Sequence, residues 1–327
     1  MLTADVAAMW DTSVYNAGFI VVKPTNVSKR LYRMTRMISN KSANLFDQVA
    51  INIAAKVLKN EDAGLKLKTL NTQRFLAGKD YFEKQRRFFA PTERQICDQQ
   101  KQTNCAVVVH NNWIVTKAAK VYRFREHLMW MYDGDDEYYS SKNRRYLMYN
   151  DQPHTKSGNR QFTAQQIVKS NSEIYELKTA MTIGHLLNRT VILPLFHSKE
   201  TTSMVPLHYI LHLQSFDAHF GGKYRENSFL RHPKVPLDVK SGLATNLQQH
   251  TINTSYNAKL SGINIIVLAV DIVRQFGDMN DRLLKLDSLY GITVSLGNSS
   301  EDSAFKQKLY QAFYRSHHRQ FRPAGRL

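Results

Sequence analysis

The stretch Tyr15-Asn16-Ala17-Gly18-Phe19-Ile20-Val21-Val22-Lys23-Pro24 decides the fold of the N-terminal part of the chain. Small residues lead into a continuous β-branched and aromatic run, which is the pattern of a buried strand that begins at a turn. Pro24 ends this strand because proline has no backbone N–H to donate to a ladder. Ser28 then supplies an N-cap for a helix. Later in the chain, a helix over 172–187, a tight turn and an apolar strand over 190–195 make half of a parallel α/β unit, which indicates an α/β fold.

Helical and extended patterns alternate along the rest of the chain. We predict helices over 45–58, 117–128, 172–187 and 305–318, and strands over 65–70, 74–76, 106–110, 190–195 and 263–270. The turn-rich, polar stretch between these groups predicts a linker. The expected organisation is a first domain over 1–132, a polar linker over 133–165, and a second, smaller α/β domain over 166–327.

Composition limits the possible classes of function. The 327 residues carry a net charge of +18, which favours anionic partners such as sugar nucleotides, sulfated glycans or nucleic acid. No nucleic-acid module signature accompanies the charge, so nucleic acid is not the expected partner. No apolar run is long enough to suggest a membrane span. Cys97 and Cys105 are too few for a disulfide scaffold, and both a single bridge and two free thiols remain open.

Four short motifs occur in an order that is familiar from one family. They are Asn16-Ala17-Gly18-Phe19, Phe46-Asp47-Gln48, Arg74-Phe75-Leu76, and Val109-His110-Asn111-Asn112-Trp113 followed by Lys117 and Lys120. This series resembles the nucleotide-diphospho-sugar transferase family, close to glycosyltransferase family 77, which has a GT-A type fold. The resemblance covers about the first 130 residues. It implies a partial GT-A-like domain that transfers a sugar from a nucleotide diphosphate to a hydroxyl of a glycan or glycoprotein.

The resemblance also implies residue roles. Gly18 would let the backbone approach the donor, and Asn16 and Gln48 would line the donor pocket. Asp47, at a helix start, would be the catalytic carboxylate that accepts hydrogen bonds from donor-sugar hydroxyls. His110, at a strand end, would help hold Mn²⁺ or Mg²⁺ on the pyrophosphate.

Lys117 would complete the donor site by contacting a phosphate. Each of these residues also has a purely structural interpretation. Asn16 to Gly18 can be a simple turn, Asp47 a charge that stabilises a helix start, His110 a hydrogen-bonded surface histidine, and Lys117 a solvated cation.

One part of the family pattern is missing from this chain. We expect an Asp-x-Asp metal motif upstream of Asn16, but Asp5-Val6-Ala7 is not such a pair and Asp11 stands alone. Asp133-Gly134-Asp135 has the spacing but falls in the predicted linker. One imidazole does not hold a divalent cation tightly, so we expect a weak or inactive transferase whose front part and membrane anchor are missing. A truncated gene, a short isoform and a decayed paralogue all remain open.

A second resemblance lies in the C-terminal half. Tyr175 to Ala180 and Ile183 to Pro194 are similar to a helix, Leu-Asn-Arg-Thr, strand element of some multidomain relatives and of fucosyltransferase-like folds. Arg189 is either an acceptor or phosphate contact or a cation at a helix C-terminus. Sequons at Asn26, Asn40, Asn188, Asn253 and Asn298 are compatible with a glycoprotein of the Golgi lumen. The alternative function is a non-catalytic basic protein that binds acidic glycans or a partner enzyme.

Overall fold

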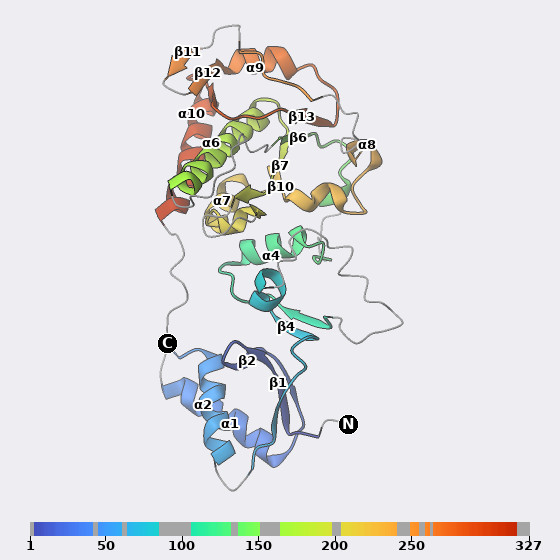
Figure 1. Ribbon diagram of the computed structural model, residues 1–327, viewed down its shortest axis with the longest axis vertical. Helices are drawn as coiled ribbons and strands as arrows, with labels where there is room; N and C mark the ends of the chain where they lie inside the picture. Colours follow the sequence, from blue (N-terminus) through green and yellow to red (C-terminus); the bar gives the residue numbers. More distant parts are fainter. Residues whose placement is uncertain are drawn as a thin grey trace. The chain divides into compact units, whose positions relative to one another are not determined.

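The computed structural model describes residues 3–41, 45–60, 64–84, 106–131, 137–150, 164–197, 204–240, 249–254, 259–261 and 264–318. The chain divides into two compact units, Met1–Val115 and Thr116–Leu327, and each has its own sheets and buried core (Figure 1). The prediction of an α/β fold is therefore confirmed. The two cysteines and Asp133-Gly134-Asp135 lie outside the described residues.

The first unit consists of a three-stranded sheet, a parallel strand pair and two long helices. In the sheet, the order is β2-β1-β3, with β1 antiparallel to β2 and parallel to β3. Strands β4 and β5 form the parallel pair. The elements are β1 (Val6–Asp11), β2 (Val14–Val22), α1 (Asn26–Lys41), α2 (Asp47–Asn60), β3 (Leu67–Thr69), β4 (Phe75–Ala77), the π-helix η1 (Lys79–Lys84) and β5 (Val108–His110).

The core of this unit lies between the sheet and the helices. In α2 the buried residues Ala50, Ile51, Ala54, Ala55 and Leu58 form one stripe, as the helical period requires. Small alanines in the stripe let the helix approach closely. The stripe packs with Val6 of β1, Leu31 of α1 and Leu65, all of which are buried. Burial of this apolar surface is the main term that holds the helices on the sheet.

Strand β2 contains an irregularity that shapes the candidate site. Ala8 of β1 pairs with Ile20, but the next residue, Met9, pairs with Asn16. Residues 17–19 of β2 therefore have no partner in β1 and bulge out of the ladder. Such extra residues bend a strand and re-aim its backbone. The predicted strand is confirmed, while the turn expected at Asn16 to Gly18 is a bulge inside the strand.

The second unit is built on a parallel sheet of order β10-β7-β6-β13. A smaller sheet, β11-β12-β14, and a two-stranded pair, β8-β9, accompany it. Helix α6 packs against the strands β6, β7 and β14. The helices are α4 (Lys117–Glu126), α5 (Glu137–Ser140), α6 (Ala164–Leu186), η2 (Leu207–Tyr209), α7 (Leu213–Phe220), η3 (Asn227–Arg231), α8 (Leu237–Lys240), α9 (Ala269–Phe276) and α10 (Ser300–His318). The strands are β6 (Tyr146–Tyr149), β7 (Thr190–Ile192), β8 (Phe196–His197), β9 (Met204–Val205), β10 (Tyr224–Arg225), β11 (Lys259–Ser261), β12 (Asn264–Leu268), β13 (Leu283–Leu286) and β14 (Ile292–Ser295).

The organisation differs from the prediction at the linker. Residues 133–165 were expected to be a polar connection, but they contribute α5 and β6. Strand β6 is an inner strand of the parallel sheet, and Tyr146 and Leu147 in it are completely buried. The division between units lies at Val115/Thr116 rather than at 132, and the second unit is the longer one. The four apolar residues of β6 are too few to stand out from the polar residues around them.

Two arginines form hydrogen bonds with backbone carbonyls at the start of this sheet. Arg189 is buried, and its guanidinium donates to the carbonyls of Tyr146 (3.2 Å), Met279 (2.7 Å) and Asp281 (2.7 Å). Burial lowers the pKa of Arg189 to about 10. This network satisfies carbonyl groups at the entry to β6 and β13. Arg189 is therefore a structural residue, and the interpretation as an acceptor contact is not supported by its position.

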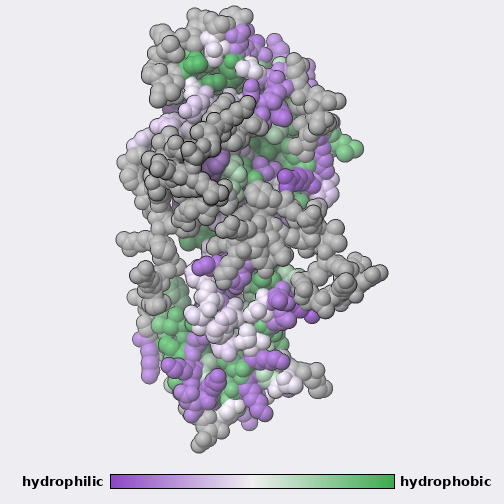
Figure 2. All heavy atoms as spheres, viewed as in Figure 1, coloured by the Kyte–Doolittle hydropathy of each residue, from purple (hydrophilic) through white to green (hydrophobic). Residues whose placement is uncertain are grey.

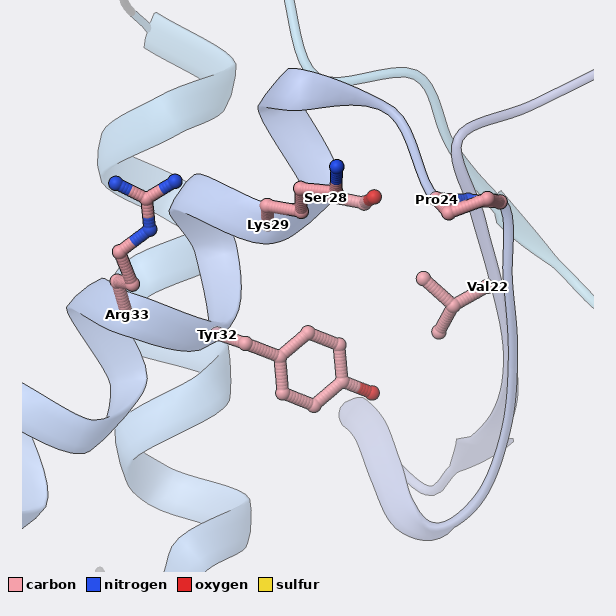
Figure 3. A pocket seen from close by; sticks show the side chains of 6 residues that line it. All are labelled: Val22, Pro24, Ser28, Lys29, Tyr32 and Arg33. Carbon is pink, nitrogen blue, oxygen red and sulfur yellow. The ribbon is translucent and has the colours of Figure 1, made fainter.

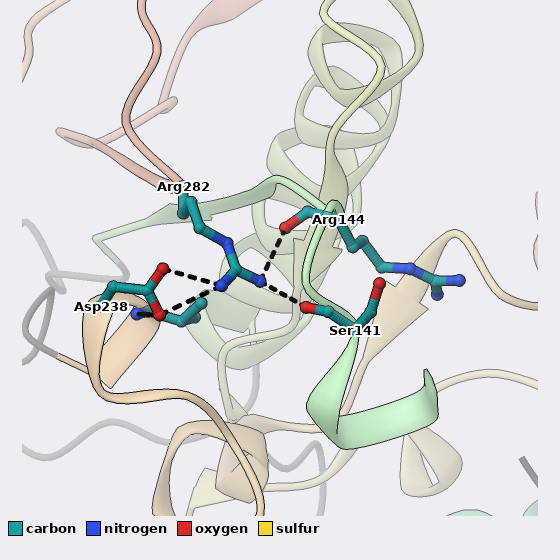
Figure 4. Close-up of polar contacts among 5 residues, drawn as sticks. Ser141, Arg144, Asp238 and Arg282 are labelled. Atoms are coloured by element: carbon teal, nitrogen blue, oxygen red, sulfur yellow. Dashed lines mark hydrogen bonds and ion pairs between the residues drawn. The ribbon is translucent and has the colours of Figure 1, made fainter. Parts of the chain in front are cut away.

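Arg282 fastens the same region from the other side. It forms an ion pair with Asp238 of α8 (2.8 Å) and donates to the carbonyl oxygens of Ser141 and Arg144 (Figure 4). The pKa of Asp238 is lowered by its hydrogen bond to Arg282. The segment after α5, the short helix α8 and the start of β13 are thus joined through one side chain.

Candidate functional site

Asp11 is the centre of a buried network in the first unit. It is the last residue of β1 and only 3% exposed. Its Oδ1 accepts a hydrogen bond from Trp113 Nε1 (2.7 Å), and its Oδ2 accepts from Asn16 Nδ2 (2.9 Å) and Asn112 Nδ2 (2.7 Å). A buried carboxylate is stable only when its oxygens are bonded in this way. The network joins β1, the bulge in β2 and the segment that follows β5.

Asn16 connects Asp11 to the backbone of the bulge. Its side chain is buried, and its Oδ1 accepts a hydrogen bond from the backbone N–H of Gly18 at 2.7 Å. The amide group therefore bonds Asp11 with its nitrogen and the bulge backbone with its oxygen. This local bond from an asparagine to a residue two positions on replaces the ladder bonds that the bulge has lost.

Gly18 and His110 lie directly against each other. A Cβ atom added at Gly18 would be 2.1 Å from His110 Cε1 and 2.5 Å from each ring nitrogen. A side chain at position 18 would therefore have to displace the His110 ring. The half-buried imidazole at the end of β5 is thereby held over the backbone of the bulge.

The start of α2 reaches the same bulge. Gln48 Oε1 accepts a long hydrogen bond, 3.4 Å, from the backbone N–H of Ala17. One turn further along, Asn52 pairs with the backbone of Tyr15 through both its oxygen (3.0 Å) and its nitrogen (2.8 Å). Asp47 is exposed, and its Oδ1 accepts from the N–H of Gln48 at 2.7 Å. Its other oxygen has no hydrogen-bond partner among the described residues.

The structure thus brings together four of the six predicted site residues, Asn16, Gly18, Gln48 and His110. Asp47 begins the helix that supplies Gln48. Lys117 is exposed and begins α4 of the second unit, so it is not part of this group within the first unit.

The network continues to the ends of two further strands. The backbone N–H of Gly78, which follows β4, donates to Asn112 Oδ1 at 2.6 Å. Lys79 Nζ lies 5.0 Å from the centre of the Trp113 ring, within cation–π range, and that ring is 42% exposed. Strands β1, β4 and β5 all end at this group, and β4 and β5 are parallel. The carboxyl ends of parallel strands are where α/β proteins bind ligands.

Sequence reasoning missed the role of Asp11. The residue was interpreted as a lone acid because Val6 to Trp10 was not recognised as a strand. An apolar run that ends in an acidic residue and is followed by a tight turn is the signal that could have found it. Asn112 and Trp113 belong to the family motif, but a single sequence does not reveal that both bond Asp11.

The residues were also tested as a metal site. Among the described residues, no three His, Cys, Asp or Glu side chains come together as a metal centre would require. Both Asp11 oxygens already accept hydrogen bonds from neighbouring side chains. The described side chains therefore do not fit a metal ion held by the protein alone, and the metal role of His110 stays a prediction.

The geometry of the first unit defines its class. It is a domain of mixed strands and helices with a polar site at the ends of its strands. Residues 3–124 match the model of the nucleotide-diphospho-sugar transferase family. The N-terminal part of the chain is therefore similar to that family, as the ordered motifs predicted. No curated protein and no solved structure matches the chain. None of the helices described has the length and apolar character needed to cross a membrane.

Proposed function

We propose that the chain is a glycosyltransferase that moves a sugar from a nucleotide diphosphate to a hydroxyl of a glycan acceptor. The bond from the sugar to the diphosphate would break, the acceptor oxygen would form the new bond, and the acceptor would lose its proton. The observation that carries the proposal is the meeting of the β2 bulge, the start of α2 and His110 at one group of strand ends. The family match supports the same activity.

The proposed roles follow from where each residue lies. The exposed backbone at Gly18 is the proposed donor contact, Asn16 holds that backbone in place through its buried amide, and Gln48 bonds the bulge from the helix side. Asp47 is exposed at a helix start, where its unbonded oxygen can accept from sugar hydroxyls. His110 is placed to bond the diphosphate or a Mn²⁺ or Mg²⁺ ion that arrives with it. Lys117 is the proposed phosphate contact that rests on the family resemblance alone.

Donor titration of the intact chain tests the proposal. A panel of uridine and guanosine diphospho-sugars, with and without Mn²⁺, is titrated by calorimetry into wild type, His110→Ala and Asp47→Asn. We expect one donor to bind, with affinity lowered about tenfold or more in both variants because each removes a polar contact. His250→Ala, which alters a histidine of the second unit, is the matched control and should leave the affinity unchanged. Binding that is indifferent to both first-unit variants would reject the site.

A second candidate function is supported by the charge. The net charge of +18 suits a non-catalytic protein that holds an acidic glycan or a partner enzyme. A Golgi lumen location and glycosylation are likewise proposals that rest on the family and on the sequons. Binding of acidic glycans without binding of any donor would favour this candidate.

A further inference from the structure

A pocket of about 390 Å³ lies between the end of β2 and the first half of α1 (Figure 3). It is lined by Val22, Pro24, Ser28, Lys29, Tyr32 and Arg33. The Tyr32 ring extends from the helix toward Val22 and Pro24, so an aromatic ring and two aliphatic groups face one another. The volume falls in the range of small-ligand sites, which run from about 300 to 1,000 Å³.

The walls of the pocket are fixed by hydrogen bonds. The backbone N–H of Thr25 donates to Ser28 Oγ (3.0 Å), and the N–H of Ser28 donates to Thr25 Oγ1 (3.2 Å). Ser28 Oγ also bonds the carbonyl of Lys23, and Thr25 Oγ1 donates to Asp5 (2.9 Å). The pKa of Asp5 is lowered, chiefly by its hydrogen bond from the backbone of Lys66. The corner that holds Val22 and Pro24 against the helix is therefore rigid before any ligand arrives.

The apolar surface in this pocket is exposed to solvent. Tyr32 is 45% exposed and Val22 is 36% exposed, although both are large side chains. Hydrophobic and hydrophilic side chains lie interspersed over the part of the view where α1 and α2 are found (Figure 2). A half-exposed aromatic ring beside aliphatic groups is a surface on which the C–H face of a sugar can stack.

The charged residues of helix α1 all have one sign. Helix α1 carries no acidic residue, and its cations are Lys29, Arg30, Arg33, Arg36 and Lys41. Within the described part of the chain, neither Lys29 nor Arg33 forms an ion pair with a carboxylate. Lys29 lies in the first turns of the helix, where the dipole disfavours a cation. Such conflicts with the local preference of an element are expected at functional or strained sites.

We propose that this pocket binds an acidic saccharide, as the remote anchor of a glycan acceptor that carries carboxylate or sulfate groups. Tyr32, Val22 and Pro24 form the stacking surface, and Lys29 and Arg33 bind the anionic group. The role as an acceptor anchor rests on the proposed transferase function. Binding of the acidic saccharide does not depend on that function.

The geometry of β2 gives the distance that such an acceptor would have to span between the pocket and the bulge. Val22 lies four residues beyond Gly18 in β2, and a strand rises about 3.3 Å per residue. The pocket is therefore roughly 13 Å along the strand from the bulge. An acceptor would span this distance with more than one sugar ring, so its acidic group would be remote from the hydroxyl that reacts. Changes in the pocket should consequently act on acceptor affinity and leave donor binding intact.

The test uses the intact chain and four defined probes. A heparin hexasaccharide, hexagalacturonate, neutral maltohexaose and a DNA duplex of equal charge are titrated at about 50 mM and about 300 mM salt. We expect the acidic saccharides to bind, the neutral one to bind at least about tenfold more weakly, and the affinity to fall with salt. Tighter binding of DNA than of either acidic saccharide would overturn the proposal in favour of nucleic acid. Equal binding of neutral and acidic saccharides would overturn it as well.

Matched variants distinguish binding in the pocket from general electrostatic attraction by the positive charge of α1. Lys29→Gln/Arg33→Gln and Tyr32→Ala should each weaken acidic saccharide binding about tenfold. Arg36→Gln/Lys41→Gln removes the same charge from the same helix outside the pocket, and should change the affinity by less than about threefold. Equal losses of saccharide affinity in the two double variants would overturn the proposal that the pocket is the binding site. If these results hold while no donor binds, the saccharide site stands and the transferase proposal fails. If a donor binds and the acidic saccharides do not, the reverse follows.

Discussion

At the scale of single residues, the contact between Gly18 and His110 decides the shape of the candidate site. The space that any Cβ would occupy is filled by the imidazole ring. The sequence indicated a glycine at this place through the family motif, but the reason for it, a ring that arrives from a strand far along the chain, could not be read from the sequence. Only the fold brings residue 110 to residue 18.

Gly18→Ala should therefore destabilise the protein. Inserting a methyl group into a filled space typically costs about 1–3 kcal/mol. Urea denaturation followed by tryptophan fluorescence measures the loss. The double variant Gly18→Ala/His110→Gly is the control, because removing the ring makes room for the methyl group. The stability change caused by Gly18→Ala should largely disappear in the His110→Gly background, and an undiminished change there would show that the clash is not the cause.

Two buried carboxylates in the second unit make a pH-dependent contribution to stability. Burial, with the charge of Glu226 as the next cause, raises the pKa of Glu126 to about 8. Burial also raises the pKa of Glu226, whose oxygens accept from the hydroxyls of Tyr138 (2.6 Å) and Tyr139 (3.3 Å). The ordinary pKa of a glutamate is 4.5. Between these values the folded state keeps a proton that the unfolded state has released.

Stability should consequently fall as pH rises from about 4.5 to about 8, because the unfolded state binds fewer protons there. Thermal unfolding at several pH values in this window measures the slope. Glu126→Gln keeps the shape of the side chain and cannot ionise, so it should flatten the pH dependence. Glu137→Gln, at the start of α5, is the control and should leave the slope as in wild type. A slope that persists unchanged in Glu126→Gln would assign the pH dependence to another group.

At the scale of elements, the long helices and several three-residue strands, β3, β4, β5 and β7, were predicted, and three other short strands were not. The predicted strand before Pro24 and the helices over 45–58, 117–128, 172–187 and 305–318 correspond to β2, α2, α4, α6 and α10. Strands β6, β10 and β13, with two to four residues each, were missed. So few residues, set among polar neighbours, do not complete enough of an alternation to be distinguished from a loop. Their strand character comes from pairing with partners that lie far away in the sequence.

Helix α1 should show a conflict between stability and binding. Replacing Lys29 by glutamate puts an acidic group in the first turns, where the helix dipole favours it by about 0.3–1 kcal/mol. We expect Lys29→Glu to unfold at a slightly higher urea concentration than wild type and to bind the heparin hexasaccharide at least about tenfold more weakly. Arg36→Glu, which lies further from the helix start, should give no gain in stability. Unchanged saccharide binding in Lys29→Glu would contradict the role proposed for α1.

At the scale of the whole molecule, the sequence and the structure agree on the fold class and differ on where the chain divides into two units. The α/β class and the two-part organisation follow from alternating apolar runs and were predicted. The predicted boundary differs from the observed one because the polar composition of 133–165 is typical of a linker, although four apolar residues in it form an inner strand. Of the candidate site, the motif residues were predicted, and the Asp11 network was not. That network depends on pairing between distant segments, which a single sequence does not reveal.

The hydrogen bonds to Asp11 also bear on how the first unit forms during synthesis. Two of its three donors, Asn112 and Trp113, follow it by 101 and 102 positions, so before nearly the entire unit has left the ribosome only Asn16 can bond the carboxylate. Closing so long a segment costs chain entropy before the bonds repay it, which slows folding. A nascent chain synthesised only as far as residue 105 lacks both donors and β5, and stays exposed to proteases and chaperones until those residues are added.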